Sequence, residues 1–194
     1  MSHGYSGRVE RGMLLWTGPE DAQRTLVFAC GDEGRVDDPV PAAVADAAVW
    51  MGVRVCRVAI EGAWPGAAQS DATLRAMIGE AAAAARGDRV LGGMSRGARA
   101  AASMVGPLHA IGLVAVSYPF HARRDPDPGE RVRDLQVRVP VLLVQGSRDA
   151  LGNREQVRGY GLPAHIDVHW VEAANHALVP RASSGLDPAG ALQG

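Results

Sequence analysis

Six short apolar runs recur along the chain, each bounded by polar or turn-forming residues. They cover residues 25–30, 53–59, 89–92, 111–116, 139–144 and 166–171. Several of these runs contain almost no polar residue, which is typical of strands that are buried on both faces of a sheet. We therefore predict six strands, together with a further strand over residues 9–16 that forms an antiparallel edge at the start.

Helical stretches separate the predicted strands. They span residues 41–51, 71–86, 96–105 and 153–160, and the second contains a run of five alanines. Alternation of strands and helices requires right-handed crossovers, which produce a mostly parallel sheet covered by helices on both faces. The pattern predicts an α/β fold with a mostly parallel sheet of about seven strands.

The length of the chain sets its domain organisation. With 194 residues, of which 47% are hydrophobic, it can build one packed core but not two ordinary domains. We expect a single domain over residues 1–182 and a flexible tail over 183–194, where apolar residues are few and Gly and Pro recur. The charged, proline-broken segment 123–130 is predicted to lack regular structure.

Charge and residue usage exclude several classes of function. The net charge of −1 provides no field that would attract nucleic acid or a lipid surface, and no apolar run is long enough for a membrane span. All 20 basic residues are Arg, so lysine chemistry and the P-loop are excluded. Two cysteines inside apolar runs make neither a disulfide framework nor a zinc site. We expect a cytoplasmic protein without metal or cofactor.

A serine motif stands between a predicted strand and a predicted helix. Gly93-Met-Ser95-Arg-Gly97 matches the pattern G-x-S-x-G, which by itself is a weak signal in a glycine-rich chain. Its context is more specific, because a short apolar strand enters the motif and an alanine-rich helix leaves it. Such a strand–turn–helix forms a nucleophile elbow, in which small residues flank the serine because neighbouring backbones come close. Ser95 is therefore a candidate nucleophile.

Two further residues follow Ser95 in the order that a catalytic triad on this fold requires. A serine hydroxyl needs a base that an acid orients, and the chain order in such folds is Ser, acid, His. Asp149 comes just after the strand at 139–144, and His176 comes five residues after the last strand. Each also has an ordinary interpretation, as a turn aspartate and as a solvated loop histidine. Together with Ser95 they predict a triad.

The chain resembles small uncapped alpha/beta hydrolases of the dienelactone-hydrolase-like kind, and among them the bacterial relatives of the NSL-complex regulatory subunit. The resemblance covers about residues 23–182 and implies Ser95 as nucleophile, His176 as base and Asp149 as the orienting acid. It implies no substrate. The segments that carry it are Gly92-Gly-Met-Ser-Arg-Gly-Ala-Arg-Ala100, Ser117-Tyr-Pro-Phe-His121, Val144-Gln-Gly-Ser-Arg-Asp149 and His169-Trp-Val-Glu-Ala-Ala-Asn-His176.

The loop after Cys30 departs from the family pattern, which usually has His-Gly followed by small residues. Here it reads Gly31-Asp32-Glu33-Gly34. The resemblance implies an oxyanion hole made by the backbone N–H groups of Arg96 and Asp32. Two carboxylates beside a developing oxyanion would oppose its charge, whereas side chains directed to solvent would leave the backbone donors unaffected. Both interpretations stay open. The candidate pocket residues are Gly31, Glu33, Tyr118 and His121.

Two functions compete on this evidence. The first is a serine hydrolase that cleaves an ester or thioester of a small acyl substrate through an acyl-enzyme. The alternative is a catalytically weak or inactive protein that keeps the hydrolase fold as an interaction scaffold, which the altered loop favours. An intact Ser, Asp and His set favours the enzyme, because a scaffold has no physical reason to keep all three.

The C-terminal segment bears on the oligomeric state. Residues 177–194 contain Pro180, Gly185, Pro188 and Gly190, which interrupt any long helix that could cover the end of the sheet. An apolar face left bare in this way favours a homodimer with its contact near the last strand and the tail. The alternative is that Leu178, Val179, Leu186 and Leu192 fold back over this face.

Overall fold

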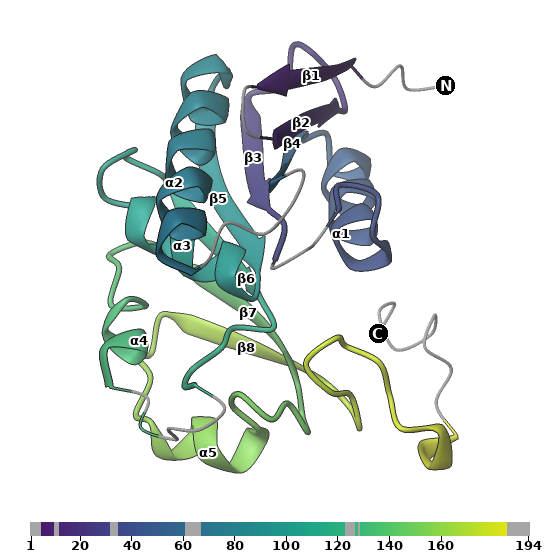
Figure 1. Ribbon diagram of the computed structural model, residues 1–194, viewed down its shortest axis with the longest axis vertical. Coiled ribbons are helices and arrows are strands. Elements are labelled where there is room, and N and C mark those ends of the chain that lie inside the picture. The colour runs from purple at the N-terminus through teal and green to yellow at the C-terminus, as the bar shows by residue number, and fades with distance from the viewer. Residues whose placement is uncertain are drawn as a thin grey trace.

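The computed structural model describes residues 5–9, 12–31, 35–60, 67–122, 127 and 129–185 (Figure 1). In this part of the chain, one sheet has the strand order β1-β2-β4-β3-β5-β6-β7-β8. Its strands are β1 Tyr5–Val9, β2 Gly12–Thr17, β3 Arg24–Ala29, β4 Arg54–Ile60, β5 Asp88–Met94, β6 Gly112–Val116, β7 Val141–Gly146 and β8 Ile166–Val171. The helices are α1 Pro39–Trp50, α2 Ala67–Ala84, α3 Arg96–Met104, α4 Gly129–Arg133, α5 Arg154–Gly159 and the 3-10 turn η1 Ala182–Ser184.

The sheet confirms the predicted α/β fold. Strands β3 to β8 are mutually parallel, and only β1 and β2 run antiparallel to their neighbours. The prediction of one edge strand over 9–16 is wrong, because this region forms a hairpin in which β1 is the edge and β2 pairs with β4. The residues of β2 alternate between buried and half-buried, as in a strand with one face on the core, and Leu14 and Trp16 are among the buried ones. The sheet consequently has eight strands, one more than expected.

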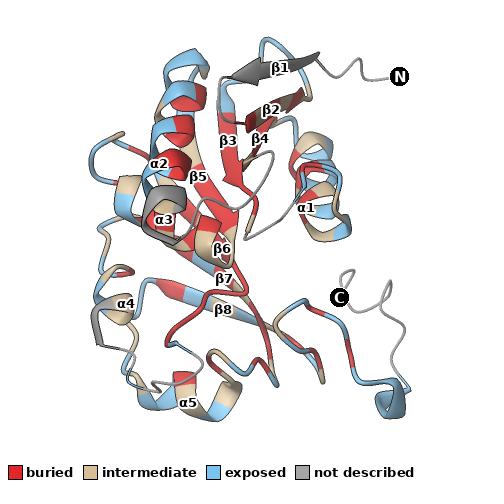
Figure 2. Cartoon of the chain, viewed as in Figure 1, coloured by how far each residue is buried: buried red, intermediate tan, exposed pale blue. Residues whose placement is uncertain are grey.

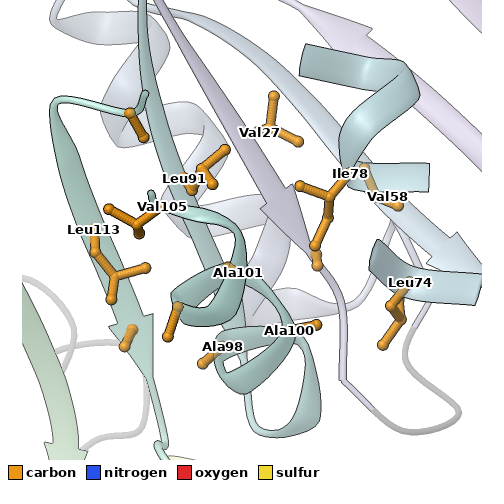
Figure 3. Close-up of a cluster of buried hydrophobic side chains, with 14 of the residues drawn as sticks. Val27, Val58, Leu74, Ile78, Leu91, Ala98, Ala100, Ala101, Val105 and Leu113 are labelled. Atoms are coloured by element: carbon orange, nitrogen blue, oxygen red, sulfur yellow. The ribbon is translucent and has the colours of Figure 1, made fainter. Parts of the chain in front are cut away.

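Helices cover the two faces of the sheet unequally. On one face, α2 and α3 pack against β3, β4 and β5 through side chains such as Leu74, Ile78 and Leu91 (Figure 3). The same cluster continues to Leu135 and Val157, next to α4 and inside α5. On the other face, the buried cluster draws its helical residues from α1 alone among the described elements. The central strands β3 and β5 are largely buried (Figure 2), and Val27 and Leu91 on them are fully buried.

The short helix α4 was not predicted. It begins at Gly129, inside the segment 123–130 that the sequence predicts to be irregular; residues 123–126 and 128 lie outside the described part. Tertiary contacts hold this helix, because Tyr118 Oη donates to Arg131 O at 2.8 Å and Arg131 Nη1 donates to Pro119 O at 3.0 Å. Local propensity could not reveal contacts that come from a distant loop.

Two predictions, the domain boundary and the lack of a membrane span, can be compared with the structure only within the described residues. The boundary between a domain at 1–182 and a tail at 183–194 stays a prediction, since residues 186–194 lie outside the described part. None of the described helices combines the length and the apolar character that a bilayer span requires.

Candidate active site

Ser95 stands in a strained turn between β5 and α3. Its φ and ψ are 53° and −120°, a conformation that non-glycine residues rarely adopt and that costs energy. The turn is held in place because Ser95 N donates to Val116 O on β6 at 2.9 Å, while Ser95 O accepts from Ala98 N at the start of α3. The strained turn lifts the side chain of Ser95 above the carboxyl ends of the strands.

Backbone crowding explains the glycines on either side of Ser95. A Cβ atom on Gly97 would lie 2.7 Å from Cys30 O, and one on Gly93 would lie 2.7 Å from Ala29 O. Real Cβ atoms do not approach carbonyl oxygens so closely, so any side chain would push α3 away from β3. The G-x-S-x-G pattern is thus a packing requirement of this strand–turn–helix.

The structure brings Ser95, His176 and Asp149 into one hydrogen-bonded chain. Ser95 Oγ lies 2.9 Å from His176 Nε2, and His176 Nδ1 lies 2.8 Å from Asp149 Oδ2. With a proton on Nδ1 donated to the carboxylate, Nε2 is the acceptor for the Ser95 hydroxyl. Asp149 is fully buried, whereas 31% of the His176 side chain remains exposed. This arrangement can take a proton from Ser95 at the solvent-facing end of the site.

The sheet explains how residues far apart in the sequence meet. The three residues follow β5, β7 and β8, and the carboxyl ends of parallel strands share one edge. The loops after β7 and β8 are then bound to each other, since Arg148 N donates to Ala174 O at 2.9 Å and Ala173 N donates to Ser147 Oγ at 2.9 Å. A Cβ on Gly146 would lie 2.6 Å from Ala174 O, so this close approach also depends on a glycine.

Gln145 is a buried residue of the site that sequence reasoning did not assign. Its Nε2 donates to Asp149 Oδ2 at 2.9 Å and to the carbonyl oxygens of Gly152 and Tyr118, and its Oε1 accepts from Tyr118 N at 2.8 Å. Leu151 N donates to the other carboxylate oxygen of Asp149. With His176 Nδ1 as the third donor, these hydrogen bonds hold the Asp149 carboxylate in one orientation. The signal in the sequence was a single amide at the end of an otherwise apolar strand.

Asn175 was also missed. Its Oδ1 accepts from Ala177 N at 3.0 Å and from Val179 N at 3.1 Å, so its side chain closes the turn that carries His176. The backbone of Asn175 pairs with the same turn, because Leu178 N donates to Asn175 O. Asparagine is common in loops of every kind, so nothing in the sequence signals that this one organises the histidine loop.

We expect Gln145→Met to lower kcat by about tenfold to a hundredfold with KM unchanged, because Gln145 orients Asp149 but does not line the pocket. Thermal unfolding should show a loss of about 1–3 kcal/mol, since Tyr118 N loses its buried acceptor. Thr25→Val is the matched control: Thr25 is fully buried and donates to Arg86 O far from the site. It should lower stability and leave kcat unchanged. A fall in kcat that is equal in both variants contradicts a positioning role for Gln145.

A pocket of about 350 Å³ opens beside Ser95. Its walls are Gly31, Asp38, Pro41, Met94, Leu151, His176 and Ala177. Gly31 stands against the nucleophile, because a Cβ there would lie 3.3 Å from Ser95 Cβ. Among the described lining residues, Asp38 is the one acidic residue and most of the others are apolar. These described walls can contact an apolar group placed beside Ser95.

Two of the predicted pocket residues lie elsewhere. Tyr118 is fully buried and packs edge-on against the Phe120 ring at 5.1 Å, and burial raises its pKa above the ordinary value. His121 is 4% exposed, with Nδ1 3.0 Å from Ala122 O, and it does not line the pocket. Tyr118 belongs to the main buried cluster, and its Oη donates to Arg131 O of α4. The prediction that these two residues line the pocket is corrected accordingly.

The structure describes one half of the predicted oxyanion hole. Arg96 is the first residue of α3, so its backbone N–H lies at the positive end of the helix dipole, directly after Ser95. Its guanidinium group pairs with Asp71 at 3.2 Å. Asp32 and Glu33, which carry the second predicted donor and the opposing charges, lie outside the described residues.

The two thiols offer no competing nucleophile. Burial raises the pKa of Cys30 and of Cys56 to about 12, so the reactive thiolate is scarce at neutral pH. Within the described ranges, no three His, Cys, Asp or Glu side chains gather as ligands for a metal ion. Ser95, with its Oγ 2.9 Å from His176 Nε2, therefore stays the candidate nucleophile among these groups.

Comparisons with known proteins agree with this fold. A family model described as "Alpha/beta hydrolase domain" matches residues 66–194, which is more than half of the chain. The chain belongs to the alpha/beta hydrolase family.

Solved structures with the same fold include a serine hydrolase homologue from Coxiella burnetii, with 19% identity and a TM-score of 0.71 over 90% of this chain and 88% of that one. The lidless serine hydrolase XC6422 from Xanthomonas campestris has 17% identity and a TM-score of 0.60 over 91% and 86%. The esterase Pf2001 from Pyrococcus furiosus has 14% identity and a TM-score of 0.68 over 92% and 83%.

Proposed function

We propose that this protein is a serine hydrolase that cleaves an ester or thioester bond of a small acyl substrate. The observation that carries the proposal is the chain of contacts from Ser95 to His176 to Asp149, at 2.9 and 2.8 Å. Both distances are within the reach that proton transfer requires. The esterase and serine hydrolases of the same fold support the same class of reaction.

The geometry supports a two-step mechanism. His176 Nε2 accepts the hydroxyl proton as Ser95 Oγ bonds to the carbonyl carbon, and then gives that proton to the leaving alcohol or thiol. Water next attacks the acyl-enzyme: His176 takes its proton, the bond to Ser95 Oγ breaks, and Ser95 recovers its hydrogen as the acid departs. Asp149 stabilises the imidazolium that forms in both steps. These reaction steps need no cofactor.

The proposed oxyanion hole uses the backbone N–H groups of Arg96 and Asp32. The start of α3 is suited to the first donor, because helix N-termini attract negative charge. The second donor and the effect of the Asp32 and Glu33 carboxylates stay predictions from the sequence. Within the family, we place the chain among the relatives of the NSL-complex regulatory subunit, on the motifs around Ser95, Ser117–His121 and Asp149.

Labelling with a fluorophosphonate probe tests the proposal, because the probe reacts with an activated serine whatever the natural substrate is. We expect the wild-type protein to be labelled at Ser95, and Ser95→Ala to remain unlabelled. Ser103→Ala is the control, because Ser103 is exposed on the same helix and should not affect labelling. A folded wild-type protein that resists the probe at high concentration contradicts the enzyme and favours the interaction scaffold.

A further inference from the structure

Among the described residues, α1 is the one helix on its face of the sheet, and strand residues beside it stay exposed. Leu142 on β7 is 41% exposed, and Val114 and Val144 next to it are only half-buried. These three side chains share a face, since Val114 pairs with Leu142 in the register of β6 and β7 and side chains alternate along a strand. With α1 they form an apolar groove of about 400 Å³.

The second wall of the groove is a stripe on α1. Ala43, Ala47 and Met51 are spaced four residues apart, so they lie on one side of the helix, and all three are exposed. Alanines at such positions let another chain approach the helix closely. His169 is the one titratable side chain that lines the groove. The groove is therefore built to receive an apolar group.

Large exposed apolar side chains concentrate at the same place. In the described part of the chain they number five, namely Trp50, Met51, Ile111, Leu142 and Val179. Met51 and Leu142 line the groove, Trp50 ends α1 beside Met51, and Val179 follows the lining residue Leu178. Trp50 is 89% exposed. Single exposed apolar residues are normal, but a cluster of this kind marks an interaction surface.

We propose that the occupant of the groove is a second copy of this chain, with Trp50 of each copy inserted into the groove of the other. The same surface carries a projecting indole ring and an apolar hollow, which is the self-complementarity that a two-fold dimer requires. Tryptophan is also the residue most often found to dominate the energy of an interface. This dimer is independent of the proposed catalytic function.

The area that the proposed contact would bury is typical of transient complexes. A tryptophan side chain buries roughly 200 Å² and covers a similar area of the groove, so two reciprocal insertions with their rims bury about 1,000 Å². This is the lower end of the range for specific interfaces, where contacts are transient. We therefore expect a weak dimer, with a Kd on the order of 10 µM, that exchanges with the monomer at working concentrations.

Sedimentation equilibrium from about 1 to about 200 µM measures this exchange. Leu142→Asp and Ile111→Asp are a matched pair, since the two residues are 41% and 44% exposed but only Leu142 lines the groove. We expect Leu142→Asp to raise Kd at least about thirtyfold and Ile111→Asp to leave it unchanged. A monomeric wild-type protein over this whole range, or equal effects of the two variants, overturns the proposal.

Trp50→Ala tests the other half of the contact without touching the core, because the side chain is almost wholly exposed. It should also raise Kd at least about thirtyfold, with an unchanged melting temperature. A mixture of Trp50→Ala with Leu142→Asp restores one of the two contacts, since one partner supplies Trp50 and the other an intact groove. The mixture should associate more tightly than either variant alone. No gain on mixing, or a dimer that survives Trp50→Ala, overturns the reciprocal insertion.

Discussion

Replacing Asp149 by Asn is expected to lower kcat by about a thousand- to ten-thousand-fold. In the native site, Asp149 Oδ2 accepts from both Gln145 Nε2 and His176 Nδ1, and Oδ1 accepts from Leu151 N. Whichever way an asparagine amide is turned, its NH2 group faces at least one of these donors, and two donors cannot hydrogen-bond to each other. A histidine that accepts from this amide carries its proton on Nε2, and then it cannot take the proton of Ser95.

Steady-state hydrolysis of an activated acetyl ester measures this loss. Asp134→Asn serves as the control, because Asp134 pairs with Arg99 at a partly exposed position away from the nucleophile. The control should keep its activity to within about twofold, as expected for a surface ion pair. A fall of less than about tenfold for Asp149→Asn means that His176 does not depend on Asp149, which contradicts the proposed triad.

Gly97→Ala is expected to destabilise the fold by about 2–5 kcal/mol, although alanine is the better helix former. The added methyl group would lie 2.7 Å from Cys30 O and 2.8 Å from the carbonyl carbon of Ala29. Those atoms belong to the end of β3 and its continuation, which cannot retreat without breaking their pairing with β4 and β5. The strained turn at Ser95 would be displaced together with α3.

Gly79→Ala is the matched control for this prediction. Gly79 is also helical, on α2, but a Cβ there meets no atom within 4 Å. Helix propensity then acts alone, and the substitution should stabilise the protein by about 0.5–1 kcal/mol. Thermal or urea unfolding of the two variants gives the comparison. Similar stability changes in both would show that the crowding at Gly97 is relieved at little cost.

The order of elements followed from local signals in the sequence. Apolar runs and helical stretches placed β3 to β8 and four of the helices within a few residues of their observed bounds. The errors lie where partners outside the local segment decide the structure. The hairpin β1–β2 depends on pairing with β4, and the short helix α4 depends on contacts with Tyr118 and Pro119.

The candidate site was predictable only in part. Ser95, Asp149 and His176 could be proposed because each follows an apolar strand and because their order matches a known pattern. Gln145 and Asn175 could not, since amides have ordinary roles at strand ends and in loops. Tyr118 and His121 were placed at the pocket because their segment follows a strand, whereas both side chains turn into the core.

By itself, the sequence determined the fold class and the three residues proposed for catalysis, because hydrophobic periodicity and residue order are local properties of the chain. Only the tertiary structure decided which side chains meet. It placed Ser95, His176 and Asp149 within hydrogen-bond distance, gave Asp149 its donor from Gln145, and left Leu142 exposed beside α1. The physical reason is that the triad contacts join loops that follow different strands and meet at one edge of the sheet, although their residues are 81 and 27 positions apart, so no local pattern contains them.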